Sequence, residues 1–262
     1  MKKVVLTTCS ALAVLALSSA FGSGVSYASE GNAHPLPNIQ WSFDGPFGTY
    51  DKASLQRGLL VYRQVCSACH SLDRVAYRNL TALGYSEDQV KAIAGEYTIV
   101  DGPNDEGEMF ERAGRPSDHF KAPFVNEQAA IAANGGALPP DLSLITKARV
   151  GGANYVFGVL TGYAEAPVDF EGTILDGQYY NKHMTGNVIK MPPPLTAGGV
   201  AYEDGYPTSV EQYAKDVSTF LAWAAEPEME HRKQMGFKVI LFLLAFASIM
   251  YAVKKRIWSK AH

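Results

Sequence analysis

The chain has 262 residues, of which 47% are hydrophobic and 19% charged, which excludes a disordered or fibrous protein and allows one sizeable domain with appendages. Two of its 23 basic residues lie in the first 28 positions and seven lie at 231–262, so residues 29–230 hold 14 basic residues against all 26 acidic ones, a net charge of −12. A domain this acidic is expected to repel nucleic acid and attract a basic partner. The alternative is that the acidic charge only keeps the domain soluble.

The N-terminal segment has the pattern of a secretory signal peptide. Lys2 and Lys3 precede an apolar run over 11–21, and the small-residue sequence Ser26-Tyr27-Ala28 follows it. Cleavage after Ala28 is therefore predicted, which would export residues 29–230. An uncleaved membrane anchor is the alternative, although the apolar run is short for a helix that needs ~20 residues to span a bilayer.

The first element predicted after this segment is a helix that starts at Asp51, a favourable N-cap residue. Leu55, Leu59, Tyr62 and Cys66 recur at helical spacing, so they share one apolar face. Because this face ends at Cys66, the helix is expected to lead directly into a cysteine motif.

The motif is Cys66-Ser67-Ala68-Cys69-His70, which matches the attachment sequence of a c-type haem. Cys66 and Cys69 can each bond one vinyl group of the porphyrin, and His70 is then held as an axial iron ligand. A zinc half-site or a thiol redox pair also uses two cysteines at this spacing. Zinc requires further ligand pairs, whereas the only other cysteine, Cys9, lies in the predicted signal peptide. A thiol redox pair requires a preceding strand, where a helix is predicted. One covalent haem c is therefore the predicted cofactor.

The remaining elements of the exported domain are predicted to be helices joined by long loops rich in glycine and proline. Capping residues and terminal glycines place these helices at 86–95, 126–134, 154–161 and 210–225. Asp176-Gly177, between Thr173-Ile174-Leu175 and Gln178-Tyr179-Tyr180, indicates a β-hairpin. The domain is therefore expected to be mainly α-helical with one small hairpin.

The sixth iron ligand has four candidates. Met191 is favoured because Pro192-Pro193-Pro194 form a rigid, extended segment that can hold a thioether over the haem. Met184 is the main rival, and His183 or His119 would give a bis-histidine haem. An iron closed on both faces is typical of an electron carrier, whereas a vacant sixth position would permit peroxidase chemistry.

The C-terminal segment is predicted to anchor the protein in a membrane. With its flanks, the uncharged run 239–253 reaches about the ~20 residues of a membrane span. Four basic residues follow it: Lys254, Lys255, Arg256 and Lys260. The positive-inside rule then places a tail of residues 256–262 in the cytoplasm, residues 231–255 in the anchor, and residues 29–230 outside. A buried core helix is the alternative.

Several longer stretches resemble the cytochrome c1 family, the haem subunit of the ubiquinol-cytochrome c oxidoreductase (cytochrome bc1) complex. They are 61–70, 134–143, 149–157, 160–163, 224–228 and 231–233, and they extend over most of the mature chain. Together they are far more specific than the haem motif alone. The resemblance implies a class I-like c-type cytochrome domain with long loops and one C-terminal transmembrane helix.

The resemblance also implies roles for individual residues. Met191 would be the axial ligand, and Pro140 would pack beside the haem and His70. Arg149 would pair with a haem propionate, a role that suits a guanidinium because it can bind a carboxylate through two parallel hydrogen bonds. Tyr155 would lie near the haem edge. The plain alternatives are a core methionine, a loop proline, a surface arginine and a core tyrosine.

By the same resemblance, the protein would carry electrons from an iron-sulfur (Rieske) subunit to a soluble or membrane-anchored c-type cytochrome. Cytochrome b and the Rieske protein are the expected partners, in a bacterial cytoplasmic membrane with the haem domain on the periplasmic side. Quinol oxidation would belong to the complex and not to this chain. Six acidic residues resemble the family's surface for docking a soluble cytochrome c: Glu96, Asp101, Asp105, Glu106, Glu108 and Glu111. The alternative for this run is a solvated loop. A haem peroxidase and an anchored shuttle or sensor that acts outside any complex are the alternative functions.

Overall fold

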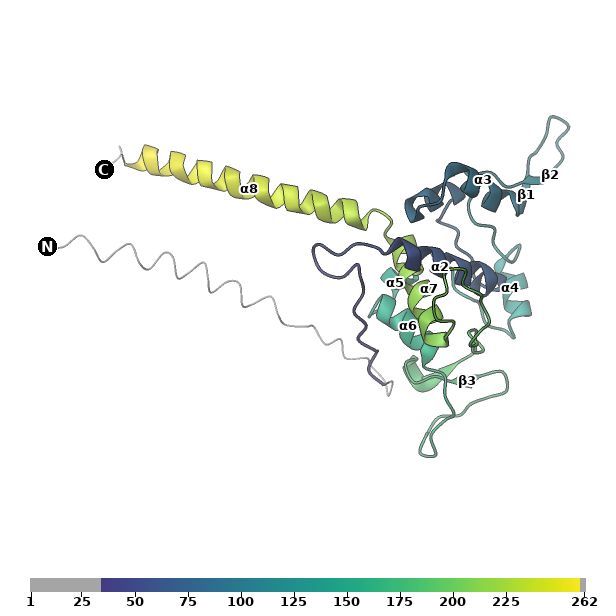
Figure 1. Cartoon of the computed structure of the whole chain (residues 1–262). Helices are drawn as coiled ribbons and strands as arrows, with labels where there is room; N and C mark the ends of the chain where they lie inside the picture. Colours follow the sequence, from purple (N-terminus) through teal and green to yellow (C-terminus); the bar gives the residue numbers. More distant parts are fainter. Residues whose placement is uncertain (1–33, 260–262) are drawn as a thin grey trace.

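Two helices far apart in the sequence pack together at the centre of the fold. The computed structural model describes residues 34–259, so the signal peptide predicted for residues 1–28 lies outside the described residues. α2 (Lys52–Gln64) and α7 (Val210–Ala225) lie side by side (Figure 1). Their fully buried side chains include Leu55, Leu59, Tyr62, Tyr213, Val217 and Phe220. The burial of each such side chain contributes ~1.5–3 kcal/mol, so this pair forms the main core.

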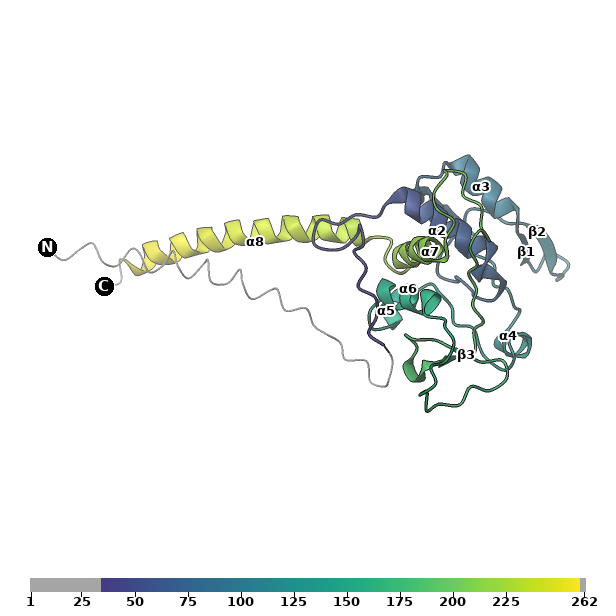
Figure 2. The ribbon, with the colours of Figure 1, turned by 60° about the horizontal axis from the view of Figure 1, so that its bottom comes forward.

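Two of the other helices pack against this pair, and polar side chains cap several of the helices. α5 (Ile145–Ala148) and α6 (Ala153–Thr161) pack against α7, whereas α3 (Glu87–Gly95) packs against the 3₁₀ segment η2 (Tyr77–Leu83). α4 (Glu127–Ala133) lies apart from the central pair (Figure 2). Asp51, Ser86, Asn126 and Ser209 each accept a backbone N–H in the first turn of the helix that follows. The predicted helices are confirmed within two residues at each end; η2 and α5 were not predicted.

The strands differ from the prediction. Asp176-Gly177 lies in a turn in which Gln178 N donates to Leu175 O, but residues 173–175 form no strand. Tyr179–Tyr180 (β3) pairs instead with Val188–Ile189 (β4), across a loop that contains the 3₁₀ turn η3 (Thr185–Asn187). The larger hairpin joins β1 (Thr98–Asp101) to β2 (Phe110–Ala113). The prediction of a hairpin at Asp176-Gly177 was therefore wrong, because a local turn sequence does not determine which distant segment pairs with a strand.

Gly58 allows the close approach of α2 to α7. A Cβ atom at this position would overlap the backbone oxygen of Asp216 and would lie 2.6 Å from Cβ of Phe220. Backbone and Cβ atoms cannot move aside as a flexible side-chain end could. The two helices can therefore reach this separation only with glycine at the crossing point.

Replacing Gly58 with alanine is expected to destabilise the protein by about 1–3 kcal/mol, the usual cost of overpacking a close helix contact. Chemical denaturation of the full chain in detergent would measure the free energy of unfolding. Gly95→Ala is the matched control, because a Cβ there meets no atom within 4 Å and alanine favours helix. Equal stabilities of the two variants would contradict this account of the crossing.

A buried ion pair joins the two central helices. Arg57 on α2 is 7% exposed, and its Nε donates to Oδ2 of Asp216 on α7 at 3.0 Å, where Asp216 is 0% exposed. Asp216 also accepts hydrogen bonds from Ser54 and Tyr202. The guanidinium reaches the 44% exposed Asp204 at 2.8 Å as well. The network therefore links both helices to the loop that precedes α7.

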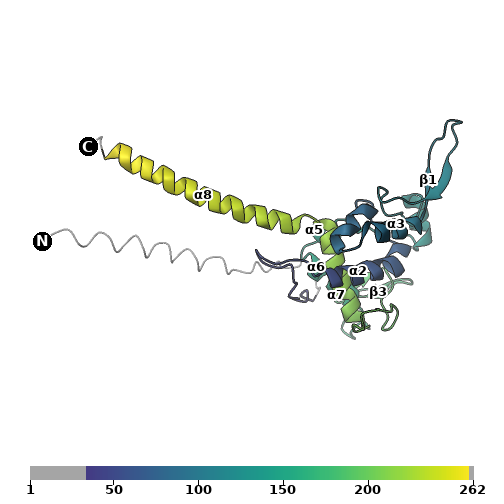
Figure 3. The same ribbon diagram turned by 45° about the horizontal axis from the view of Figure 1, so that its top comes forward.

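The last helix, α8 (Met229–Trp258), projects away from the domain as a single rod (Figures 1 and 3). An 18-residue window of this helix has a mean hydropathy of 2.1, and none of that window is buried against the rest of the described chain. Its length and composition are those of a helix that can cross a membrane. The alternative of a buried core helix is therefore wrong.

Candidate haem site

The cysteine motif lies directly after α2, where the helix tightens into a 3₁₀ turn. α2 ends at Gln64, two residues before Cys66, and η1 (Cys66–Ala68) follows. The backbone N–H groups of Cys69 and His70 both donate to the oxygen of Cys66, at 3.1 and 2.9 Å. This single turn holds both thiols and the imidazole within one short, hydrogen-bonded segment.

His70 is held by a residue 70 positions later in the sequence. Its Nδ1 lies 2.7 Å from the carbonyl oxygen of Pro140. A carbonyl oxygen can only accept a hydrogen bond, so Nδ1 carries the proton and Nε2 keeps the lone pair that binds a metal. Burial lowers the pKa of His70, although the Pro140 hydrogen bond opposes this effect. The neutral imidazole, which is the form that ligates iron, is therefore favoured.

Asp141 fixes the segment that carries Pro140. Its Oδ2 accepts from Ser71 Oγ at 2.8 Å and from Asp73 N at 2.9 Å, and Leu142 N donates to Ser71 O at 3.0 Å. Burial alone would raise the pKa of Asp141, but hydrogen bonds from Asp73, Ser143 and Ser71 outweigh burial and hold that pKa below its usual value. The ionised carboxylate thus joins residues 140–143 to the segment that follows His70.

Replacing Asp141 with asparagine is expected to destabilise the protein by about 1.5–3 kcal/mol at neutral pH, because hydrogen bonds to a charged acceptor are lost. The pKa of Asp141 is depressed in the folded state, so its stabilising effect is complete above the ordinary carboxyl pKa of ~3.9. The effect disappears as the pH falls through the depressed value. The stabilities of the native protein and the variant should therefore begin to approach each other as the pH falls below about 4, and should coincide only below the depressed pKa of Asp141. A difference in the free energy of unfolding between the native protein and Asp141→Asn that stays the same at every pH would contradict the stabilising role of the ionised Asp141 carboxylate.

Tyr62 connects the motif to the central core. This side chain is buried on α2, and its hydroxyl donates to the carbonyl oxygen of His70 at 3.1 Å. Its ring packs against Phe120 and Phe220, with ring centroids 5.9 and 5.8 Å away. The backbone of His70 is therefore held from the core side, while its side chain is held by Pro140.

The surroundings of the two cysteines disfavour the alternative uses of the motif. Burial raises the pKa of the Cys66 thiol to about 12, whereas redox-active thiols have lowered pKa values. Within residues 34–259, no three His, Cys, Asp or Glu side chains form a group that could hold a metal ion. A structural zinc site needs four ligands of this kind. The donor set instead fits a haem, which needs two thiols and one imidazole from this segment.

Met184 and Met191 lie on the same stretch of chain but have different neighbours. The hydroxyl of Tyr155 on α6 lies 3.5 Å from Sδ of Met184. The hydroxyl of Tyr163 donates to the backbone oxygen of Met191 at 3.0 Å, so that residue is held through its backbone. Both methionines are half-buried. The structure therefore brings Tyr155 to the rival methionine, whereas the thioether of Met191 makes no polar contact with another residue among 34–259.

The two histidine candidates lie in other surroundings. His183 Nδ1 faces the backbone oxygen of His34 at 3.3 Å. Its ring lies against α6, where a Cβ at Gly158 would approach it to 3.3 Å. His119 Nδ1 contacts the backbone oxygen of Asp73. The imidazoles of His183 and His119 therefore contact backbone segments outside residues 184–194, the stretch that carries the two candidate methionines.

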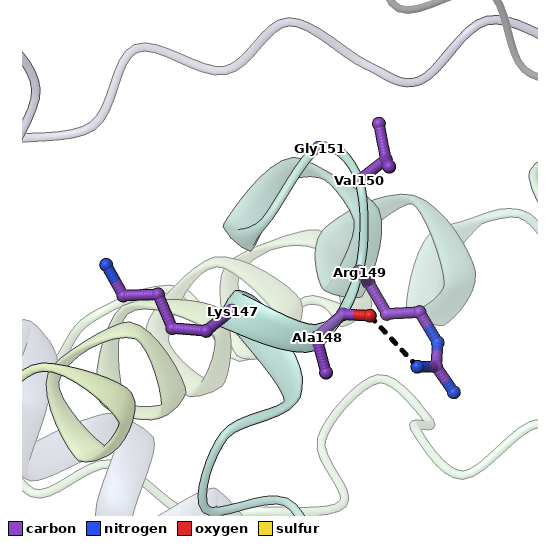
Figure 4. Close-up of a pocket in the computed structure, with 5 residues that line it drawn as sticks. All are labelled: Lys147, Ala148, Arg149, Val150 and Gly151. Atoms are coloured by element: carbon purple, nitrogen blue, oxygen red, sulfur yellow. Dashed lines mark hydrogen bonds between the residues drawn. The ribbon is translucent and has the colours of Figure 1, made fainter.

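Arg149 lies on the surface at the end of α5. One side-chain nitrogen donates to the backbone oxygen of Ala148 at 3.1 Å (Figure 4). An open pocket of about 320 Å³ adjoins it, lined by residues 147–151. Lys147 points to the opposite side and pairs with Glu226. Arg149 has no carboxylate partner among residues 34–259, so its guanidinium retains donors for a bound carboxylate.

The predicted acidic surface gathers mainly on the β1–β2 hairpin, which projects from the domain (Figure 3). Two of its carboxylates are engaged, since Glu96 pairs with Arg63 and Asp101 pairs with Arg112. The other four are exposed: Asp105, Glu106, Glu108 and Glu111. The part of this surface that is open to a basic partner is therefore the outer part of the hairpin.

Sequence reasoning missed two residues that organise the site. Asp141 was noted only within a longer stretch, and Tyr163 was not assigned a role. A detectable signal was present for Asp141, because an aspartate two residues before Ser143 favours a turn closed by its own side chain. No local signal predicts that Tyr163 reaches the backbone of Met191.

Comparisons with known proteins agree with this geometry. The model of the "Cytochrome C1 family" matches residues 41–261. The chain is 53% identical over 255 residues to "Cytochrome b/c1" of Bradyrhizobium diazoefficiens, which covers 90% of this chain but only 37% of that longer protein. It is 46% identical over 249 residues to "Cytochrome c1" of Rhodospirillum rubrum, covering 90% and 91% of the two chains. It is also 53% identical over 224 residues to "Cytochrome c1 1, heme protein, mitochondrial" of Arabidopsis thaliana, covering 85% and 72%.

These matches extend far beyond the cysteine motif, through the central helices and into α8. They account for the haem-type donor set, the mainly helical fold and the single apolar C-terminal helix together. Because the family model covers most of the chain, the chain belongs to the Cytochrome C1 family, whose members carry a c-type haem.

Proposed function

We propose that the chain is the electron-transfer subunit of a quinol-cytochrome c oxidoreductase. It would pass electrons from a Rieske iron-sulfur protein to a soluble or anchored c-type cytochrome, beside cytochrome b. The observation that carries this proposal is the 2.7 Å contact between His70 Nδ1 and Pro140 O, which leaves Nε2 available to an iron beside two cysteines. When bound, one haem c supplies the one-electron chemistry.

The residues of the chain would hold this group from several sides. Cys66 and Cys69 would form the thioether bonds, and His70 and Met191 would occupy the two axial positions. Pro140 orients the imidazole, because its carbonyl oxygen accepts a hydrogen bond from Nδ1–H. An iron closed on both faces transfers electrons without binding oxygen or peroxide, which separates this function from that of a peroxidase.

Arg149 and Tyr155 would complete the surroundings of the haem. Arg149 has free donors beside an open pocket, which fits a role in binding a propionate through two hydrogen bonds. Tyr155 would lie at the haem edge, where its hydroxyl also contacts Met184. Both side chains restrict where the group can sit; neither takes part in a bond-breaking step.

The proposed location follows from charge and hydropathy. Residues 29–230 would lie on the periplasmic side of a bacterial cytoplasmic membrane, and residues 256–262 in the cytoplasm, because Lys254, Lys255 and Arg256 follow the apolar helix. The outer part of the β1–β2 hairpin would then face a basic, soluble acceptor.

Purification through an affinity tag on this chain tests the proposal. We expect a complex that contains cytochrome b and a Rieske protein, with one haem covalently attached to this subunit by mass spectrometry. Quinol added to that complex should reduce the c-type haem, and carbon monoxide should leave the spectrum of the reduced protein unchanged. A chain that purifies alone and is not reduced by quinol would favour an independent shuttle or sensor. Carbon monoxide binding to the native protein would favour a peroxidase.

A further inference from the structure

The loop 41–50 lies against the first turns of α8, next to the proposed membrane span (Figures 1 and 2). Lys233 on α8 donates from Nζ to the backbone oxygens of Phe43 and Gly48, at 2.6 and 3.0 Å. Glu230 accepts from the backbone N–H of Tyr50 at 2.8 Å. Three hydrogen bonds therefore join this loop to the start of the helix.

Phe47 is the large apolar side chain at the tip of this loop. It is 77% exposed, and its ring meets the ring of Phe237 edge to face, with centroids 6.1 Å apart. Phe237 lies at the start of the apolar stretch of α8 and is 51% exposed. A single exposed apolar residue is common on protein surfaces, but this one extends the apolar surface of a membrane helix onto a second segment.

The loop is held in a fixed shape before any contact with a bilayer. Asp44 N donates to Trp41 O at 3.1 Å, and Thr49 N donates to Ser42 O at 3.0 Å. Gly48 packs so closely that a Cβ there would overlap the backbone oxygen of Asp44. The insertion of Phe47 would therefore require little additional ordering of the backbone.

Three acidic residues of this junction are engaged within the protein, whereas a fourth, Glu228 at the start of α8, is exposed. Asp44 accepts from Trp41 N at 2.9 Å, Glu226 pairs with Lys147 and Arg232, and Glu230 accepts from the Tyr50 backbone. Beyond them, Lys238 follows Phe237 and is exposed. Aromatic rings with a neighbouring lysine are typical of the zone where a membrane protein meets lipid headgroups.

We propose that the loop 41–50 is a second membrane contact, in which Phe47 inserts into the lipid headgroup region beside α8. This inference rests on the proposed membrane anchoring of α8. Together, the loop and the helix hold the haem domain at a defined tilt on the bilayer, because two separate points of contact restrict a rotation that one helix end leaves free.

Single-cysteine variants of the full-length holoprotein in nanodiscs test the inference. Phe47→Cys would be labelled with the environment-sensitive fluorophore NBD, in discs of phosphatidylcholine and phosphatidylglycerol that contain lipids with nitroxides at shallow or deep positions. Leu244→Cys, in the middle of α8, reports whether the helix spans the bilayer. Val100→Cys, on the exposed hairpin at the other end of the domain, is the aqueous control. Cys66 and Cys69 would be thioether-linked and unreactive, and Cys9, in the predicted signal peptide, would be replaced by serine.

We expect the label at position 47 to be quenched several-fold more strongly by shallow nitroxides than the label at position 100, with a blue-shifted emission. The label at position 244 should be quenched by deep nitroxides. Equal, weak quenching at positions 47 and 100, with position 244 still quenched, would overturn the loop contact and leave the anchor intact. An unquenched label at position 244 would overturn both. Protection of position 47 only within the assembled complex would assign the loop to a protein partner instead and would also overturn the inference.

Discussion

Replacing Met191 with leucine is expected to open the sixth position of the haem iron. Leucine preserves the volume and apolar character of methionine but has no sulfur to donate. The reduced variant should therefore bind carbon monoxide, which the native protein should not. Its reduction potential should fall by a substantial part of the ~0.8 V range that axial ligands span, because a thioether favours the ferrous state. Optical spectra and a redox titration would measure both effects.

Met184→Leu is the matched control for this experiment. It removes the same atoms from a half-buried position seven residues away, where the sulfur already contacts the Tyr155 hydroxyl at 3.5 Å. This control should keep the native spectrum and remain closed to carbon monoxide. The opposite result, with carbon monoxide binding to Met184→Leu and an unchanged spectrum and potential for Met191→Leu, would show that Met184 is the axial ligand and not Met191.

Replacing Asp216 with alanine is expected to destabilise the domain by about 3–5 kcal/mol, because it leaves the charge of Arg57 buried without its main partner. That loss is a large part of the 5–15 kcal/mol by which a typical domain is stable, so the protein should accumulate poorly. The free energy of unfolding of the full chain in detergent is the relevant measurement.

Asp204→Ala is the matched control, because Asp204 binds the same guanidinium but is 44% exposed. Solvent screens this pair, so its loss should cost only a small fraction of what Asp216→Ala costs. The double variant Arg57→Met with Asp216→Leu should recover much of the loss, since apolar groups of similar volume can replace a buried pair. Comparable losses for Asp216→Ala and Asp204→Ala would show that burial does not determine the strength of this network.

The residues changed in these experiments are positioned by contacts between distant parts of the chain. The imidazole of His70 depends on Pro140, the backbone of Met191 depends on Tyr163, and α2 depends on α7 for the burial of Arg57. The residues proposed to bind the haem therefore come from separate loops that pack around the central helix pair. This arrangement explains why Gly58, at the crossing of the two central helices, should affect the stability of the whole domain.

The sequence by itself determined the features that depend on neighbouring residues. The cysteine motif requires only five consecutive positions, and the helices follow from caps and apolar spacing within single segments, as the agreement of α7 with the predicted 210–225 shows. The hydropathy of α8 is likewise a local property. The family resemblance could also be recognised from linear stretches of sequence.

Only the tertiary structure decided which distant segments meet. It paired Tyr179–Tyr180 with Val188–Ile189 and not with residues 173–175, and it placed the ionised Asp141 across the segment that follows His70. The physical reason is that a turn or a cap is stabilised within a few residues. A strand partner or a hydrogen bond across 70 residues is selected by the packing of the whole core, which no short stretch of sequence encodes.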